Sequence, residues 1–553
     1  MPGWKKENLN IISGNKTQYA PKMITFILSI VALILGYVFY GRYVEKTFGP
    51  DDRPTPAVYM ADGVDYIPLS GWRIFMIQFL NIAGTGPIFG AIMGMWYGPS
   101  AYLWIVFGCI FAGAMHDYFS GMLSIRKDGA SLPELVGIYL GGRTRRVMLV
   151  FSVLLLVMVG AVFVLSPAAL LSSLLKDTMF GDLLFWIIAI FAYYVIATIL
   201  PVDKIIGKIY PLFAIALIFM AFGLMVALFV KFPTVPELWD GLGNMGAARL
   251  GIKDSDPLVP ALFITIACGA ISGFHATQSP LMARCVKSER LGRRIFYGAM
   301  IFEGFVALVW ATVSSYFFYS DGWREVLAAT APEQLAAVER QLAAGTTITQ
   351  VFGNAAEVVM VMCNSWLGIA GGILAVLGVI AAPITSGDTA LRSARLIIAE
   401  FLTLDQKPIR KRLYISIPMF VCTILLIVWQ MENKDGFNVI WKYFGWANQT
   451  LSVFTLWTIT VYLALKKKNC LISLIPALFM TFVCISFICI SKQAMGMDAE
   501  IGYLIGGAGS ITLLLLFLNW KRKMEHFFTQ SQQKTHYKRA EREEMWKRER
   551  ENR

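Results

Sequence analysis

Long apolar stretches recur along almost the whole chain and constrain its fold more than any other feature. A helix needs about 20 apolar residues to cross the hydrocarbon core of a bilayer. By this rule the sequence predicts thirteen membrane-spanning helices, at residues 23–40, 72–97, 100–122, 146–172, 183–200, 208–230, 258–281, 294–319, 355–384, 412–430, 439–464, 470–491 and 499–520. We therefore expect an all-α polytopic membrane protein.

The composition favours the same class over a soluble protein. Hydrophobic residues make up 57% of the 553 residues and charged residues only 15%, whereas soluble proteins carry roughly 25% charged residues. The first apolar stretch, residues 23–40, has no small-residue cleavage site and is expected to remain as a span. The eight cysteines lie in or beside apolar stretches without a C-x-x-C pair, so we expect buried thiols rather than disulfides or metal ligands.

Basic residues are distributed unequally among the predicted loops. The loops after the first, third, fifth, seventh, ninth and eleventh spans hold 24 Lys and Arg residues with their flanks, and the alternate loops hold 9. Positive residues favour the cytoplasmic side, which predicts an external N-terminus and a cytoplasmic C-terminus in the cell (inner) membrane. The lysines before residue 23 oppose this orientation. The charged segment 322–345 is predicted to be an external loop helix.

Two predicted spans are interrupted by glycine and proline, at residues 81–87 and 267–280. Such breaks persist in membranes where unwound backbone lines a cavity and faces a ligand. Close packing along Gly86, Gly90 and Gly94 is the alternative explanation. The residues of the two breaks that we expect to bind substrate are Ala83, Gly84, Thr85, Gly86, Pro87, Ser272, Gly273 and His275.

The two breaks lie five spans apart, which predicts two halves of opposite orientation in the membrane. We therefore expect a 5+5 inverted-repeat core of the leucine-transporter-like type. The predicted segments are an external N-terminus, first span and cytoplasmic loop at 1–71, a core at 72–464 with repeats at about 72–230 and 258–464, two additional spans at 465–520, and a basic cytoplasmic tail at 521–553.

Six stretches between about residues 80 and 410 resemble the carbon starvation protein A (CstA) family. They are Ile82-AGTGPIFGAIMG, Gly113-AMHDYF, Ser124-IRKDGASLPEL, Ile266-ACGAISGFHATQSPLMARC, Tyr297-GAMIFEGFVAL and Thr385-SGDTALRSARLIIAEFLTLDQ. Members of this family are described as peptide transporters, and some take up pyruvate. The resemblance implies an inner-membrane secondary transporter of small peptides and/or pyruvate that acts under carbon starvation. Residues 76–79 (MIQF) differ from the His-His pair of well-known members, so no single member's substrate is carried over.

Ionisable residues inside predicted spans are candidates for ion coupling, because burying a charge in a bilayer is costly. Glu303 lies nearly three turns into the eighth predicted span, at the matching Glu of the family, and is our expected proton carrier; helix packing is its alternative role. Asp117 lies near the cytoplasmic end of the third predicted span. It is either a coupling residue or an interfacial partner of Arg126 or Lys127.

Hydroxyl and carboxyl groups follow the ninth predicted span, at Thr385, Ser386 and Asp388. The likeness to leucine-transporter-like folds implies that a Thr/Ser pair there holds Na⁺ with backbone carbonyls. Capping of a helix end, or an Asp388–Arg392 pair across one turn, is the alternative. We expect no cofactor, with H⁺ as the coupling ion and Na⁺ as the second candidate.

Other classes of function fit the sequence less well. A channel would need a filter motif, and an enzyme would need a nucleophile–base pair or a metal motif; neither pattern is present in the sequence. The alternative function is a nutrient-sensing membrane receptor that binds the same ligand without transport. The expected partners are a small-molecule substrate and membrane lipids but no nucleic acid, because the net charge of +13 comes without a nucleic-acid-binding motif. A homo-oligomer is left open.

Overall fold

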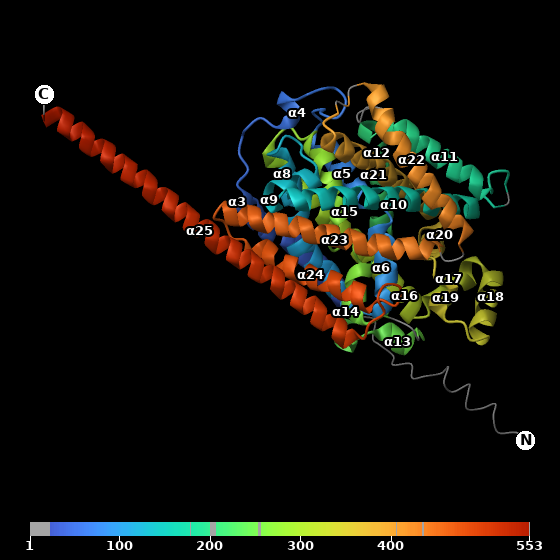
Figure 1. Ribbon diagram of the computed structural model, residues 1–553. Helices are drawn as coiled ribbons and strands as arrows, with labels where there is room; N and C mark the ends of the chain where they lie inside the picture. The colour runs from blue at the N-terminus through green and yellow to red at the C-terminus, as the bar shows by residue number, and fades with distance from the viewer. Residues whose placement is uncertain are drawn as a thin grey trace, which may run out of the picture.

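A computed structural model describes residues 23–551, apart from residues 177, 200–205, 253–255, 405, 407 and 434–435. Every regular element in this part of the chain is a helix (Figure 1). Nine helices there are long and apolar enough to cross a membrane, and the bent pair 71–82 and 86–97 makes a tenth candidate. The prediction of an all-α, multi-pass protein is therefore confirmed, whereas the count of thirteen spans stays a prediction.

The first half of the chain begins with a helix outside the proposed core and continues through the first proposed repeat. Its elements are α2 (Ile24–Leu35), η1 (Gly36–Tyr40), α3 (Gly41–Phe48), α4 (Pro56–Tyr59), α5 (Gly71–Ile82), α6 (Gly86–Gly94), η2 (Met95–Tyr97), α7 (Ser100–Leu103), η3 (Trp104–Gly113), α8 (Ala114–Ile125), α9 (Leu132–Leu140), α10 (Gly142–Leu174), α11 (Leu183–Ile199) and α12 (Ile206–Lys231). The break between α5 and α6 bends the two helices by 43°.

The second half repeats this order of a broken helix followed by continuous ones. Its elements are η4 (Leu238–Asp240), α13 (Met245–Arg249), α14 (Leu258–Thr265), α15 (Gly273–Ala283), η5 (Glu289–Leu291), η6 (Arg293–Tyr297), α16 (Gly298–Tyr319), α17 (Gly322–Thr330), α18 (Pro332–Ala343), α19 (Ile348–Val351), α20 (Ala355–Ala375), η7 (Val376–Ile380), α21 (Ala381–Phe401), α22 (Ile409–Glu432), α23 (Gly436–Leu465), α24 (Leu471–Ile490) and α25 (Ala499–Glu551).

Contacts between the halves are reciprocal. The second part of the first broken helix, α6, packs against α16, which follows the other broken helix. In the same way α15, the second part of the other broken helix, packs against α8. The spans that follow the breaks also share a π-helical first part, η3 and η6. This exchange of equivalent contacts is what a two-fold relation between inverted repeats produces.

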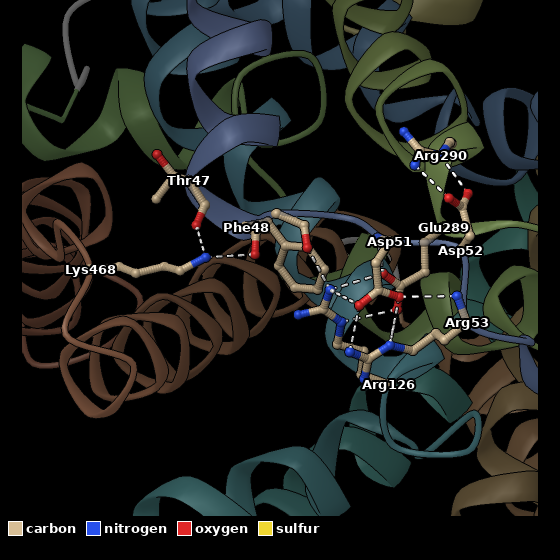
Figure 2. Close-up of polar contacts among 10 residues, drawn as sticks. Thr47, Phe48, Asp51, Asp52, Arg53, Arg126, Glu289, Arg290 and Lys468 are labelled. Atoms are coloured by element: carbon tan, nitrogen blue, oxygen red, sulfur yellow. Dashed lines mark hydrogen bonds and ion pairs between the residues drawn. The ribbon is translucent and has the colours of Figure 1, made fainter.

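Loops that carry most of the basic residues meet at one end of the helix bundle, which we call the basic end. Arg126, at the end of α8, donates hydrogen bonds of 2.9 Å to both carboxylate oxygens of Glu289 and one of 2.7 Å to the carbonyl of Gly49 (Figure 2). Lys468 donates to the carbonyl of Phe48 at 2.7 Å. Loops that follow the first, third, seventh and eleventh predicted spans are therefore held together.

Salt bridges strengthen this closure of the basic end. Glu289 is fully buried, and the Arg53 guanidinium lies 3.8 Å from the same carboxylate oxygen that accepts from Arg126 Nε (Figure 2). Arg53 also pairs with Asp51 at 2.6 Å and holds the pKa of that carboxyl below its usual value. The Arg126 guanidinium lies 4.0 Å above the Phe48 ring. Segment 49–53 thus covers the bundle at this end.

The loops with fewer basic residues meet at the other end. Tyr319 donates to the carbonyl of Trp96 at 2.7 Å, and Lys231 pairs with Glu325 at 3.5 Å. Helices α13 and α17–α19 gather at this end, and α4 lies at the opposite one (Figure 1). Alternate loops therefore lie at opposite ends of the bundle, as the charge distribution predicts; which end faces the cytoplasm stays a prediction.

Cysteine labelling tests this orientation. We expect Ala336→Cys, on exposed α18, to react with a membrane-impermeant maleimide in intact cells, and Arg410→Cys, exposed at the start of α22, to react only after the membrane is opened. Of the native cysteines, only Cys422 is exposed, and it lies inside the membrane-spanning α22. The unmodified protein is the background control, and the reverse labelling pattern would invert the topology.

Three predicted boundaries differ from the structure. The ninth predicted span, 355–384, is wrong: the long apolar span covers Gly371–Phe401, and a kink at Gly368 separates it from a shorter helix. Segment 322–345 forms two helices rather than one, because Pro332 begins a new helix. The predicted tail at 521–553 continues α25 as a helix to Glu551.

Candidate functional site

The two breaks lie against each other in the middle of the bundle. A Cβ atom added at Gly86, the first residue of α6, would lie 2.5 Å from Cys268 in the unwound stretch between α14 and α15. One added at Gly90 would lie 2.8 Å from the carbonyl oxygen of Thr265. The glycines of α6 therefore pack closely on the second break. The predicted break and the alternative, close packing of glycines, both apply at this place.

Two neighbouring cavities share Met93 and Trp441, and the smaller one reaches the breaks. The smaller, of about 280 Å³, is lined at the breaks by Gly86 and Cys268 and toward the less basic end by Asp256. Burial raises the pKa of Asp256, and neighbouring lysines oppose that shift. The larger cavity, of about 830 Å³, lies between α6, α10, α20 and α23. Volumes of about this size are typical of small-molecule sites.

Four buried ionisable side chains form a chain beside the second break. His116 Nδ1 lies 2.8 Å from one oxygen of Asp117, and His275 Nδ1 lies 2.9 Å from the other. On its far side, His275 Nε2 lies 3.5 Å from Glu303. All four side chains are inaccessible to solvent. Helices α8, α15 and α16 supply them, and the packing of α15 against α8 brings His275 to Asp117.

In this buried row of side chains, the imidazole of His275 lies between the carboxylates of Asp117 and Glu303. Whenever Asp117 and Glu303 are both ionised, a protonated His275 lies between two negative charges and is stabilised by both. Neither oxygen of Glu303 nor His275 Nε2 makes a hydrogen bond of normal geometry to a described residue. Glu303 is therefore held less tightly than Asp117, whose two oxygens each face a histidine. This arrangement can take up, hold and release a proton inside the membrane.

The same place offers donors for a metal ion. Cys268, His275 and Glu303 each provide one donor atom, and these atoms lie within 4.8 Å of one another. A structural zinc site uses four protein ligands, and Cys268 Sγ already lies 3.5 Å from the Ser272 hydroxyl. The three donor atoms are one short of such a site.

The three predicted Na⁺ ligands have different hydrogen-bond partners. Residues 385–388 lie inside α21 rather than at the end of a span, so that part of the prediction is wrong. The Ser386 hydroxyl reaches the first break, where it donates to the carbonyl of Asn81 at 3.2 Å. Thr385 bonds within its own helix, and Asp388 accepts from Tyr210 at 2.6 Å. Of the three, only Ser386 contacts the broken helix.

The remaining predicted site residues are all buried but have different neighbours. Thr85 has a hydroxyl without a hydrogen-bond partner among the described residues, and a Cβ at Gly84 would lie 3.0 Å from Ser386 Oγ. Ser272 instead donates to Asn448 at 3.1 Å, and Gly273 packs against the backbone of α23. Thr85 and Gly84 thus remain closer candidates for substrate contact than Gly273.

The expectation that Asp117 pairs with Arg126 or Lys127 is wrong. Arg126 pairs with Glu289 at the basic end, and Asp117 is buried between two histidines. Asp117 and Arg126 are close in the sequence. Nine positions separate them, however, and their side chains have different neighbours. This correction moves Asp117 from the interface into the buried chain.

Sequence reasoning missed Asn448 on α23. Its side-chain oxygen accepts a hydrogen bond of 2.6 Å from the backbone of Phe274 and one from Ser272, so it fixes the start of α15. The signal was present as three consecutive polar residues, 448–450, inside an apolar span. Gln78 and Asn81 on α5 are also buried with amide groups that have no partner among the described residues.

Comparisons with known proteins agree with this architecture. The chain is 26% identical over 603 residues to the peptide transporter CstA of Escherichia coli, covering 90% of this chain and 84% of that protein. It is 46% identical over 341 residues to an uncharacterized membrane protein of Haemophilus influenzae, covering 54% and 91%. It is 28% identical over 366 residues to the pyruvate/proton symporter BtsT of Escherichia coli, covering 54% and 50%.

Solved structures show the same fold. The crystal structure of a mutant manganese transporter from Eremococcus coleocola matches with a TM-score of 0.50 at 13% identity, covering 84% of this chain and 98% of that chain. This similarity shows the fold alone and confirms the leucine-transporter-like core. The reported relatives with a named activity are transporters and not enzymes.

The family itself follows from the extent of the sequence match. The family described as "Carbon starvation protein CstA" matches residues 22–176 and 168–487, which include both breaks and the buried chain. The match thus extends beyond residue 410, where the six stretches end. The chain belongs to the carbon starvation protein CstA family.

Proposed function

We propose that the protein is an inner-membrane secondary transporter that takes up pyruvate-like carboxylates and/or small peptides under carbon starvation, coupled to the proton gradient through Glu303. The buried chain His116–Asp117–His275–Glu303 is the observation that carries this proposal. Ionisable groups buried in a membrane are costly and mark ion pathways. A relative named as a pyruvate/proton symporter supports the same coupling ion.

The buried side chains from His116 to Glu303 lie next to the proposed substrate site. His275 lies in the first turn of α15, directly after the second break, and Glu303 lies on the helix against which α6 packs. A substrate that binds at the breaks therefore lies next to the proton carrier. Loading of substrate and proton can then depend on the same opening of the bundle, as symport requires.

Uptake into proteoliposomes tests the proposal. The full chain is reconstituted, and labelled pyruvate, dipeptide and tripeptide uptake is measured under separately imposed pH and Na⁺ gradients. We expect a pH gradient with the acidic side outside to drive accumulation of at least one substrate, and a Na⁺ gradient alone to drive none. A chelator should leave the rate unchanged.

Other results of this assay would indicate Na⁺ coupling, a bound metal ion or a receptor. Accumulation driven by Na⁺ alone would contradict proton coupling and direct attention to Ser386 and the carbonyls of α5. A loss of uptake with chelator would assign a metal ion to Cys268, His275 and Glu303. Saturable binding without transport under any gradient would favour the nutrient-sensing receptor.

A further inference from the structure

We propose that Arg392 and Arg395 of α21 form a binding site for a small carboxylate near the basic end, and that Asp65 occupies this site in the conformation described here. The inference rests on the proposed function to the extent that it takes the carboxylate to be the transported substrate. Planar guanidinium groups match carboxylates with two parallel hydrogen bonds, so a pair of arginines selects this chemical class.

Both guanidinium groups are almost completely inaccessible to solvent, with 1% and 0% of their side chains exposed. Their acidic partner is Asp65, with one oxygen 3.5 Å from Arg395 Nη2 and 4.0 Å from Arg392 Nη1. Charge-assisted hydrogen bonds between such groups are about 2.7–2.9 Å long. A single carboxylate thus lies between two arginines, close enough for attraction but too far for good hydrogen bonds.

Several donors of the arginine pair remain unused. Arg395 Nη1 donates to Gln406 at 2.6 Å, and Arg392 Nη2 donates to the carbonyl of Ala197. Nε and Nη1 of Arg392 and Nε and Nη2 of Arg395 have no hydrogen-bond partner within the described part of the chain. Buried charged donors without partners are costly. The pair is therefore suited to an anion with better geometry than Asp65 provides.

The surroundings add positive charge. Arg284 is buried, donates to the carbonyl of Gly129 at 3.0 Å and lies over the Tyr66 ring. It is close enough to act electrostatically on Arg395, as is buried Arg412. Among the described residues, Asp388 also interacts electrostatically with both arginines, and its carboxylate accepts a hydrogen bond from Tyr210. The potential at the pair therefore favours a negatively charged ligand.

Asp65 belongs to the segment that precedes α5. Asp62 fixes this segment by accepting hydrogen bonds from the backbone of residues 64–66, and the backbone of Leu69 donates to the carbonyl of Cys285 at 3.2 Å. Because α5 ends at the first break, any opening of the basic end that moves α5 also moves Asp65. The arginine pair would then be left without its carboxylate.

The pair also lies between the first break and the basic end along α21. Ser386 contacts the first break, and Arg392 follows it six residues later on the same helix, about 9 Å nearer the basic end. A substrate carboxylate leaving the breaks would reach arginines that Asp65 has vacated. When the segment returns, tethered Asp65 competes with the free carboxylate and favours its release.

Chemical rescue tests the site directly. The thermal unfolding of the purified full chain is measured with acetate, pyruvate or neutral acetamide at constant ionic strength. We expect Asp65→Ala to unfold at a lower temperature and to be restabilised, saturably, by acetate and pyruvate but not by acetamide. Adding Arg395→Gln should remove this response. Asp51→Ala, which removes a half-exposed acid from the same loop, is the matched control and should respond like the unmodified protein.

Two results would overturn the proposal: no carboxylate-specific response in Asp65→Ala, or an undiminished response after Arg395→Gln is added. If Asp65→Ala does not fold, Asp65→Ser still removes the carboxylate, leaves room for a free one and gives the same readout. Since binding is measured without a gradient, this result is independent of transport, and failure of the uptake assay alone would contradict only the proposed function.

Transport measured separately from each side of the membrane shows whether the carboxylate that binds the arginine pair is the transported substrate. In proteoliposomes of known orientation, Asp65→Ser should lower the apparent KM for a transported carboxylate by about tenfold from the basic end and leave it unchanged from the other end, because a tethered competitor has been removed. Equal changes from both ends would indicate a general structural role for Asp65 and contradict the proposal. Carboxylate-specific stabilisation with unchanged KM would assign the site to an organic acid that is not transported.

Discussion

Glu303→Gln is expected to abolish accumulation driven by a pH gradient while leaving substrate exchange close to normal. Glutamine has nearly the volume of the protonated acid but cannot release a proton. The variant should therefore bind substrate and cycle with it, yet carry no proton. The structure supports this separation because Glu303 lies 3.5 Å from His275 and makes no hydrogen bond of normal geometry within the described part of the chain.

The expected effect is large. A gradient of one pH unit stores about 1.36 kcal/mol per proton, enough for roughly a tenfold accumulation ratio in one-to-one electroneutral symport. In Glu303→Gln the ratio should fall to about one, and the rate of counterflow between equal substrate concentrations should stay within about threefold of the unmodified protein. Both quantities are measured in the same proteoliposomes.

A matched substitution separates coupling from packing. Glu357→Gln removes another acid of the membrane region, one that lines the larger cavity but is not part of the buried chain, and should keep the tenfold ratio. If Glu303→Gln still concentrates substrate on the pH gradient alone, Glu303 is not the proton carrier. Loss of exchange together with accumulation would instead indicate that the carboxylate supports the fold.

The architecture could be predicted from the sequence because it depends on signals that are local in the chain. Apolar length gives the spans, and glycine with proline inside an apolar stretch gives the breaks at 81–87 and 267–280. The orientation of the two halves follows from counting spans between the breaks. Boundaries were less predictable where apolar helices join without a polar loop, as at the Gly368 kink before α21.

The partners of buried charges could not be predicted, because they are set by packing between distant helices. Asp117 and His275 are 158 positions apart, and the sequence offered Asp117 a nearer basic residue in Arg126. Asp65 and Arg395 meet in the same way from opposite halves of the chain. The sequence shows which ionisable residues lie in or beside spans, where burying a charge is costly. It does not show that Asp117 meets His275, because that contact depends on the packing of α15 against α8.

Gly273→Ala is expected to destabilise the protein and to lower transport by more than tenfold. A Cβ atom at this position would lie 2.3 Å from Leu451 Cβ and 2.4 Å from both the Asn448 carbonyl oxygen and the Ser452 nitrogen. Two of these atoms belong to the backbone of α23, which cannot rotate away. Helix α15 would have to move, and overpacking of this kind typically costs about 1–3 kcal/mol.

The movement would also disturb the site. Asn448 accepts from the backbone of Phe274, so a shift of α15 away from α23 weakens the bond that fixes its first turn. His275 lies two residues after Gly273 and would move relative to Asp117 and Glu303. A change of about 1 Å in such a contact can reduce activity about a hundredfold. We therefore expect coupled uptake to fall more than stability alone explains.

Gly507→Ala in α25 is the matched control, away from both breaks. There the new Cβ would meet no atom within 4 Å. We expect this variant to unfold at nearly the normal temperature and to retain uptake within about threefold. The measurements are the unfolding temperature in detergent and the initial uptake rate at equal reconstituted protein. Normal stability and uptake in Gly273→Ala would show that α15 and α23 separate readily, and the contact with Asn448 would then not be what holds His275 in the buried chain.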